Sequence, residues 1–120
     1  MLKIYLYDGC GSCRSARRWL ESRRLECHAV PIREQPPAVE ELAAMLAARD
    51  GRRAALCNTS GRDYRESGLG ARMAGLSDGE FLAVLSSNGN LVKRPFVIDA
   101  AAGIFLCGFR EAEWEAAFRR

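Results

Sequence analysis

Two cysteines three residues apart follow directly after a short apolar segment near the start of the 120-residue chain. The apolar segment covers residues 4–7, and the cysteines are Cys10 and Cys13. Apolar residues at helical spacing continue from Cys13 to Leu20, which gives the following segment one buried face. The sequence therefore predicts a strand, a tight turn and a helix whose first turn contains both thiols.

This arrangement has a chemical consequence for the first cysteine. A side chain at the start of a helix lies beside unpaired backbone N–H groups and the positive end of the helix dipole, and both stabilise a thiolate. Arg14 adds a positive charge nearby. Cys-x-x-Cys motifs in such settings lower the thiol pKa towards neutrality. We expect a redox-active disulfide pair in which Cys10 is the nucleophile and Cys13 resolves a mixed disulfide by thiol–disulfide exchange.

Two other interpretations of the motif stay open at this point. The pair could be half of a zinc site, but a closed structural site needs four ligands, usually as a second pair at regular spacing. The other candidates occur singly; they are Cys27, His28, Cys57 and Cys107. Alternatively both thiols could be small core residues, as free cysteines often are. The strand and helix around the motif favour the redox interpretation over both.

Composition and charge narrow the classes of function. The chain is 48% hydrophobic and 28% charged, as expected for a soluble globular protein, and its length suits a single domain over residues 1–120. A net charge of +3 is too small to indicate direct nucleic-acid binding. No secretion signal and no membrane-spanning run is recognised. Five cysteines without framework spacing fit a reducing compartment, so we expect a cytoplasmic protein without a membrane partner.

Periodicity and turn residues predict the remaining elements. Pro31 indicates an edge or an end of the second strand, and Ser77 with Glu80 forms a capping-box pattern that starts a helix. In chain order we expect a strand over 26–32, a helix over 38–49, short helical pieces between 52 and 73, a helix after Ser77, strands over 96–99 and 104–107, and a helix over 111–118. The apolar stripe of the 38–49 helix is expected to comprise Val39, Leu42, Ala43, Leu46 and Ala47.

The two late strands are separated by so few residues that they can form only an antiparallel hairpin. The order is then β-α-β, a helical middle and β-β-α. This order predicts an α/β fold of the thioredoxin-like class, a four-stranded mixed sheet with an inserted helical region over about residues 38–88. The position of the Cys-x-x-Cys after the first strand supports the same fold independently.

Four segments together resemble the arsenate reductase/Spx family, most of all its Spx/MgsR-like branch. They are Cys10-Gly-Ser-Cys13-Arg14, Leu56-Cys-Asn-Thr-Ser-Gly61 with Tyr64-Arg65-Glu66, Lys93-Arg-Pro-Phe96, and Gly108-Phe109 with Glu113-Trp114-Glu115. The resemblance covers nearly the whole chain in the family's order. It implies a thioredoxin-like fold and a cis peptide bond before Pro95, beside the active cysteines.

The resemblance also implies roles for particular residues. Cys10 and Arg94 match the nucleophile and one oxyanion-binding arginine of the glutaredoxin-dependent arsenate reductases. Two further arginines of those enzymes fall near Asn58 and Gly108 here, neither of which carries a charge. Residues that could substitute for them are Arg52, Arg53, Arg62 and Arg110. Those enzymes typically lack the second cysteine, whereas Cys13 is present and would serve as a built-in resolving thiol.

Two functions follow as expectations. The first is a thiol–disulfide reductase, with arsenate as one candidate substrate, in which Cys10, Cys13 and Arg94 are catalytic and Arg14, Pro95 and Asn58 contact substrate. It would need no bound cofactor or metal, and its co-substrate would be a thiol reductant, glutathione with glutaredoxin or thioredoxin. The second, taken from the Spx-like branch, is a redox-sensing transcriptional regulator that binds the RNA polymerase α subunit.

Overall fold

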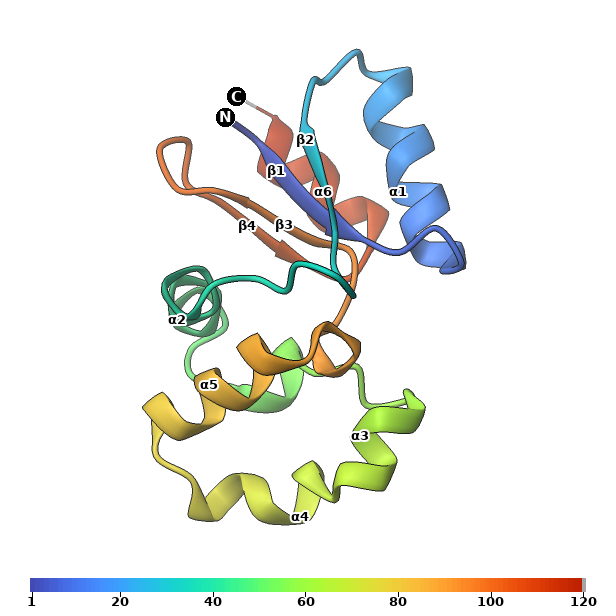
Figure 1. The fold of residues 1–120 in the computed structure, drawn as a ribbon. Coiled ribbons are helices and arrows are strands. Elements are labelled where there is room, and N and C mark those ends of the chain that lie inside the picture. The colour runs from blue at the N-terminus through green and yellow to red at the C-terminus, as the bar shows by residue number, and fades with distance from the viewer. Residues whose placement is uncertain (120) are drawn as a thin grey trace.

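The computed structural model describes residues 1–119, which form a four-stranded sheet with the strand order β2-β1-β3-β4. The central strand β1 (Lys3–Leu6) pairs in parallel with β2 (His28–Pro31) and antiparallel with β3 (Phe96–Asp99). β3 pairs antiparallel with the second edge strand, β4 (Ile104–Cys107). Figure 1 shows this sheet with helices on both sides. The predicted mixed sheet of the thioredoxin-like class, with its antiparallel hairpin, is confirmed.

Most helices occupy the segment between β2 and β3. α1 (Gly11–Ser22) connects β1 to β2, and α6 (Glu111–Phe118) follows β4. The segment between β2 and β3 contains, in order, α2 (Val39–Ala48), η1 (Arg53–Leu56), α3 (Arg62–Ser67), α4 (Leu69–Arg72), η2 (Met73–Gly75), α5 (Asp78–Ser87) and η3 (Gly89–Leu91). Figure 1 shows α3, α4 and α5 below α2, on the side away from α1.

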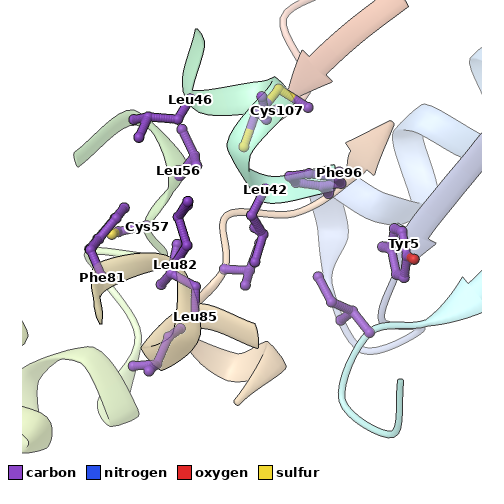
Figure 2. Packing of buried hydrophobic residues seen from close by; sticks show 14 of the residues in the cluster. Tyr5, Leu42, Leu46, Leu56, Cys57, Phe81, Leu82, Leu85, Phe96 and Cys107 are labelled. Carbon is purple, nitrogen blue, oxygen red and sulfur yellow. The ribbon is translucent and has the colours of Figure 1, made fainter. Parts of the chain in front are cut away.

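The alternation of side chains along the strands divides the core into two clusters. Ile4 and Leu6 of β1 face α1 and α6, where Trp19 and Trp114 meet edge to face with ring centroids 5.6 Å apart. Tyr5 faces the opposite side and packs in the cluster made with α2 and α5. Figure 2 shows this second cluster, in which Leu42 and Leu46 of α2 lie among Phe81, Leu82, Leu85 and Phe96. Each face of the sheet is therefore covered by helices.

The buried face of α2 differs from the predicted stripe. Leu42, Met45 and Leu46 are buried, whereas Ala43 and Ala47 are exposed and Val39 is 39% exposed. The prediction was therefore wrong for the valine and both alanines. α2 lies between the sheet and α5 (Figure 1), and it contacts both. This double contact selects the long side chains, because they bury more apolar area than alanine does.

Element ends follow local chemistry. α1 ends at Ser22, and Arg24 adopts a left-handed φ of 54° that the helix cannot contain. The capping box of α5 is confirmed, since Ser77 Oγ accepts from the Glu80 N–H at 3.1 Å and Glu80 Oε1 accepts from the Ser77 N–H at 2.8 Å. Pro31 lies in an edge strand, as predicted. No helix within residues 1–119 is long and apolar enough to cross a membrane.

Candidate redox site

A cavity of about 490 Å³ opens beside Cys10 and collects residues from distant parts of the chain. Its lining comes from the start of α1, the region after α2, the segment before β3 and the segment after β4. The lining residues are Cys10, Ser12, Arg49, Arg52, Ala55, Asn58, Lys93, Arg94, Cys107, Gly108, Phe109, Arg110 and Glu113. Five of these side chains are cationic and one is acidic, so the cavity is strongly basic.

Cys10 is the N-cap residue of α1, with φ −99° and ψ 123°, and its thiol is partly buried. Burial by itself raises the pKa of this thiol. The backbone N–H and the thiol of Cys13 and the guanidinium of Arg94 favour the charged form of this thiol and together outweigh burial, so the pKa of Cys10 is lowered. The Cys13 N–H belongs to the first turn of α1, so the start of the helix acts in the direction that lowers this pKa. Cys10 is the most acidic thiol of the motif and the one that faces the cavity.

Cys13 lies one turn into α1 and is buried. Burial raises the pKa of its thiol to about 12; a hydrogen bond from the Tyr7 N–H to the sulfur, at 3.5 Å, opposes this rise, and the neighbouring Cys10 adds to it. Both cysteines are free thiols in this structure. The pair is therefore asymmetric, with an acidic outer thiol and a protonated inner one.

The segment before β3 brings Arg94 and Pro95 to the site. The Arg94–Pro95 peptide bond is cis, as the resemblance implied, and the Pro95 carbonyl accepts a hydrogen bond from the Gly108 N–H at 2.8 Å. The Arg94 guanidinium lies 5.1 Å from the centre of the Tyr7 ring. Arg94 lines the cavity, whereas Pro95 is not among the lining residues; its carbonyl connects the segment before β3 to the segment after β4.

Asn58 reaches the cavity through a short antiparallel contact between the helical segment and the segment before β3. Cys57 and Val92 form a β-bridge, and the Lys93 N–H donates to the Leu56 carbonyl at 2.8 Å. The Asn58 side-chain amide donates to the Asn90 carbonyl at 3.3 Å. These bonds hold Asn58 among the lining residues of the cavity.

The remaining predicted cations divide into two groups. Arg52 and Arg110 line the cavity. Arg53 instead donates to the Met73 and Leu76 carbonyls and pairs with Asp78 at 2.7 Å, and Arg62 pairs with Glu66 at 3.8 Å. The structure also places Arg14 outside the lining, where its guanidinium donates to the Asp8 carbonyl at 2.9 Å.

Sequence reasoning missed Arg49 and Lys93 as site residues. Arg49 donates to the Phe105 carbonyl of β4 at 3.1 Å and lies 3.7 Å from Glu113 of α6. The stem of Lys93 crosses Gly108, where an added β-carbon would lie 2.6 Å from the lysine Cε. Lys93 stands next to Arg94 in the sequence, so its place could have been predicted, whereas the position of Arg49 depends on how α2 packs against the sheet.

The other cysteines occupy different surroundings. Cys107 lines the cavity, donates to the Lys93 carbonyl at 3.6 Å, and has its pKa raised to about 12 by burial. Cys57 lies in the core cluster of Figure 2, away from the lining, and burial raises its pKa to about 11. Cys27 is partly buried, and its pKa is also raised by burial. Within residues 1–119, no group of three or more His, Cys, Asp or Glu side chains could hold a metal ion.

Comparison with known proteins places this site in a family. The model of the ArsC family matches residues 5–117, which is nearly the whole chain and includes every residue of the cavity lining. This chain is a member of the ArsC family. A curated relative, the uncharacterised protein YusI of Bacillus subtilis, is 39% identical over 114 residues, and the match covers 95% of each chain.

Two further relatives show the range of the family. The global transcriptional regulator Spx of Enterococcus faecalis is 28% identical, over 94% of this chain and 83% of its own. A solved structure from Streptococcus mutans, described as a possible arsenate reductase, superimposes with a TM-score of 0.88 at 32% identity and covers 98% of each chain. The ArsC-family member described here is thus similar both to a regulator and to a structure associated with reductase chemistry.

The thiol environments of this member of the ArsC family predict the order in which its cysteines react. With limiting iodoacetamide at pH 7, we expect Cys10 to be alkylated at least about tenfold faster than any other cysteine, because its pKa is lowered and the others are raised. Trypsin releases residues 4–14 as one peptide, and fragmentation of that peptide assigns the label to Cys10 or Cys13.

Labelling in denaturant is the control, since the preference for Cys10 should disappear when the chain unfolds. Faster labelling of Cys27 than of Cys10 in the folded protein would contradict the electrostatics described above.

Proposed function

We propose that this protein is a thiol–disulfide oxidoreductase in which Cys10 and Cys13 reduce a disulfide-bonded substrate. The observation that carries the proposal is the asymmetry of the pair: an acidic, cavity-facing Cys10 beside a buried Cys13 with a pKa of about 12. Reduction by a dithiol pair uses one thiolate that attacks the substrate and a second, resolving thiol that stays protonated until the mixed disulfide has formed. The position of Cys10 at the start of α1 and the Arg94 guanidinium both support the first role.

The reaction then has two steps. The Cys10 thiolate attacks one sulfur of the substrate disulfide, forms a mixed disulfide and releases the other sulfur as a thiolate, which takes up a proton. Cys13 loses its proton and attacks the Cys10 sulfur, which releases the second substrate thiol and leaves a Cys10–Cys13 disulfide. Two electrons pass from the protein dithiol to the substrate. An external thiol, glutathione with glutaredoxin or thioredoxin, returns the protein to the dithiol.

The buried Cys13 is activated by the first step itself. The neighbouring Cys10 contributes to the raised pKa of Cys13. When Cys10 enters a mixed disulfide it can no longer carry a negative charge, so that contribution is lost and the Cys13 pKa falls. Resolution is therefore favoured only after a substrate has been captured.

Serine substitutions test the division of roles. Cys10→Ser should abolish reduction of disulfides, because no other thiol has an acidic, cavity-facing position. Cys13→Ser should keep the first step and accumulate a mixed disulfide at Cys10, visible as the added mass of one substrate half on the 4–14 peptide. Cys27→Ser is the matched control and should leave the rate unchanged. Equal loss of activity and of thermal stability in both motif variants would contradict the proposal.

The basic cavity supports a substrate that carries negative charge close to its disulfide. Within residues 1–119, Arg52, Lys93 and Arg94 form no ion pair with a carboxylate, so their charges remain available to a ligand. The single acidic lining residue, Glu113, is already close to Arg49 and Arg110, at 3.7 and 3.9 Å. An anion such as arsenate suits the same charges, and arsenate-dependent oxidation of a coupled thioredoxin or glutaredoxin system tests that substrate.

Charge selectivity can be measured with small disulfides. Each rate constant is first divided by the rate constant with which dithiothreitol reduces the same disulfide, which corrects for intrinsic reactivity. The corrected value for glutathione disulfide, which is anionic, should exceed that for cystamine, which is cationic, by about ten- to a hundredfold at low salt. The double substitution Arg52→Gln and Lys93→Gln should narrow the difference, and so should added salt. Equal normalised rates for the two disulfides would contradict an anionic substrate.

The Spx relatives support a second candidate function, a redox-sensing regulator. Several global transcriptional regulators named Spx match at 24–28% identity over 94–100% of this chain. On this proposal the Cys10–Cys13 disulfide alters a surface that binds the RNA polymerase α subunit. Binding of the purified α subunit to the oxidised and reduced protein separates the candidates, because a reductase has no need of it.

A further inference from the structure

Tyr7 connects the redox loop to two arginines that are distant in the sequence. Its ring centre lies 5.1 Å from the Arg94 guanidinium and 4.6 Å from that of Arg33. Distances below about 6 Å place both cations in the range of a cation–π interaction. Arg94 has no carboxylate partner within residues 1–119, and it lines the same cavity as Cys10 with its guanidinium within reach of the Tyr7 ring.

The same residue also holds the loop that carries the thiols. The Tyr7 carbonyl accepts from the Cys10 N–H at 3.0 Å, and the Tyr7 N–H donates to the Cys13 sulfur at 3.5 Å. Its ring folds back over Gly9, where an added β-carbon would lie 2.5 Å from the ring Cε2. A side chain at position 9 would therefore displace the ring. Tyr7 thus contacts the loop through its backbone and Arg94 through its ring.

We propose that Tyr7 is a positioning residue whose ring holds the Arg94 guanidinium against the Cys10 sulfur. The inference rests on the proposed function, since it concerns the nucleophile of that reaction. The role is indirect, because the ring acts on the sulfur through Arg94. Without the ring, the flexible arginine side chain would spend less time at the sulfur, and the thiolate of Cys10 would lose part of its stabilisation.

The other groups around Cys10 keep their identity when position 7 is substituted, and shape-matched variants separate the attraction of the ring for a cation from its packing over Gly9. Cys13 and Arg94 act directly on the Cys10 thiol. The charged groups that face it across the cavity are Arg49, Arg52, Lys93, Arg110 and Glu113. The bonds of Tyr7 to the Cys10 N–H and the Cys13 sulfur are made by its backbone and do not require the ring.

The test is the pH dependence of alkylation of Cys10, which needs no disulfide substrate. Tyr7→Phe keeps the aromatic ring and should leave the ionisation constant of the thiol unchanged. Tyr7→Leu should lower that constant about two- to fivefold, the equilibrium effect of losing a cation–π contact at a partly exposed site. A trifluorinated phenylalanine at position 7 keeps the shape of phenylalanine but weakens the attraction to a cation, and should reproduce the leucine result.

A double-mutant cycle shows whether the ring acts through Arg94. In an Arg94→Gln background, the Cys10 ionisation constant should be the same whether position 7 holds phenylalanine, trifluorinated phenylalanine or leucine. Two results would overturn the proposal. One is an effect of the position 7 substitutions that is equally large with arginine and with glutamine at position 94. The other is an equal Cys10 ionisation constant for phenylalanine and trifluorinated phenylalanine when Arg94 is present. The two phenylalanines have nearly the same shape, so they decide the question even where Tyr7→Leu fails to fold.

Failure of this inference is distinguishable from failure of the proposed function. If the Cys10 ionisation constant shifts as expected but the protein reduces no disulfide, the role of Tyr7 stands and the proposed reductase function is rejected. If the protein reduces disulfides but the Cys10 pKa does not depend on the ring, the reductase function stands and the role of Tyr7 is rejected.

Discussion

The stabilisation of negative charge on Cys10 is the interaction on which the rest of the site depends. Burial alone would make this thiol less acidic, so the polar groups of Cys13 and a nearby cation must more than offset the lost hydration. The helix start supplies the Cys13 N–H locally. The cation comes from Arg94, more than 80 positions further along the chain. The fold therefore has to bring the segment before β3 to the start of α1, and the antiparallel pairing of β1 with β3 does this.

The helical segment between β2 and β3 completes the cavity. The β-bridge from Cys57 to Val92 and the bond from the Lys93 N–H to the Leu56 carbonyl attach it to the segment that carries Arg94. Arg49, near the end of α2, donates to the edge strand β4 and lies beside Glu113 of α6. The cations that line the cavity beside Cys10 thus come from several elements. On the proposed function, they would take the place of the arginines that the family resemblance expects near Asn58 and Gly108.

Local signals explain how much of this could be predicted from the sequence. The Cys-x-x-Cys between a strand and a helix, the capping box at Ser77 and the spacing of the last two strands are each encoded within a few residues. The position of Cys10 at the start of α1 was predictable for the same reason, whereas the cation that acts on its thiol is the distant Arg94 and not the neighbouring Arg14. The buried face of α2 was not, because alanines and a valine gave a plausible stripe, and only the simultaneous contact with the sheet and α5 selects Met45. Arg49 in the cavity and Arg94 over the Tyr7 ring also depend on tertiary approach.

A redox titration tests the central claim, that Cys10 and Cys13 form a working dithiol–disulfide pair, most directly. The purified protein is equilibrated in glutathione buffers of graded potential, quenched by alkylation and digested, and the mass of the 4–14 peptide is followed. We predict that this peptide converts to an internal disulfide within the cytosolic range of roughly −220 to −320 mV. A peptide that carries two alkylated cysteines throughout that range would contradict the account, because the two thiols would then be structural.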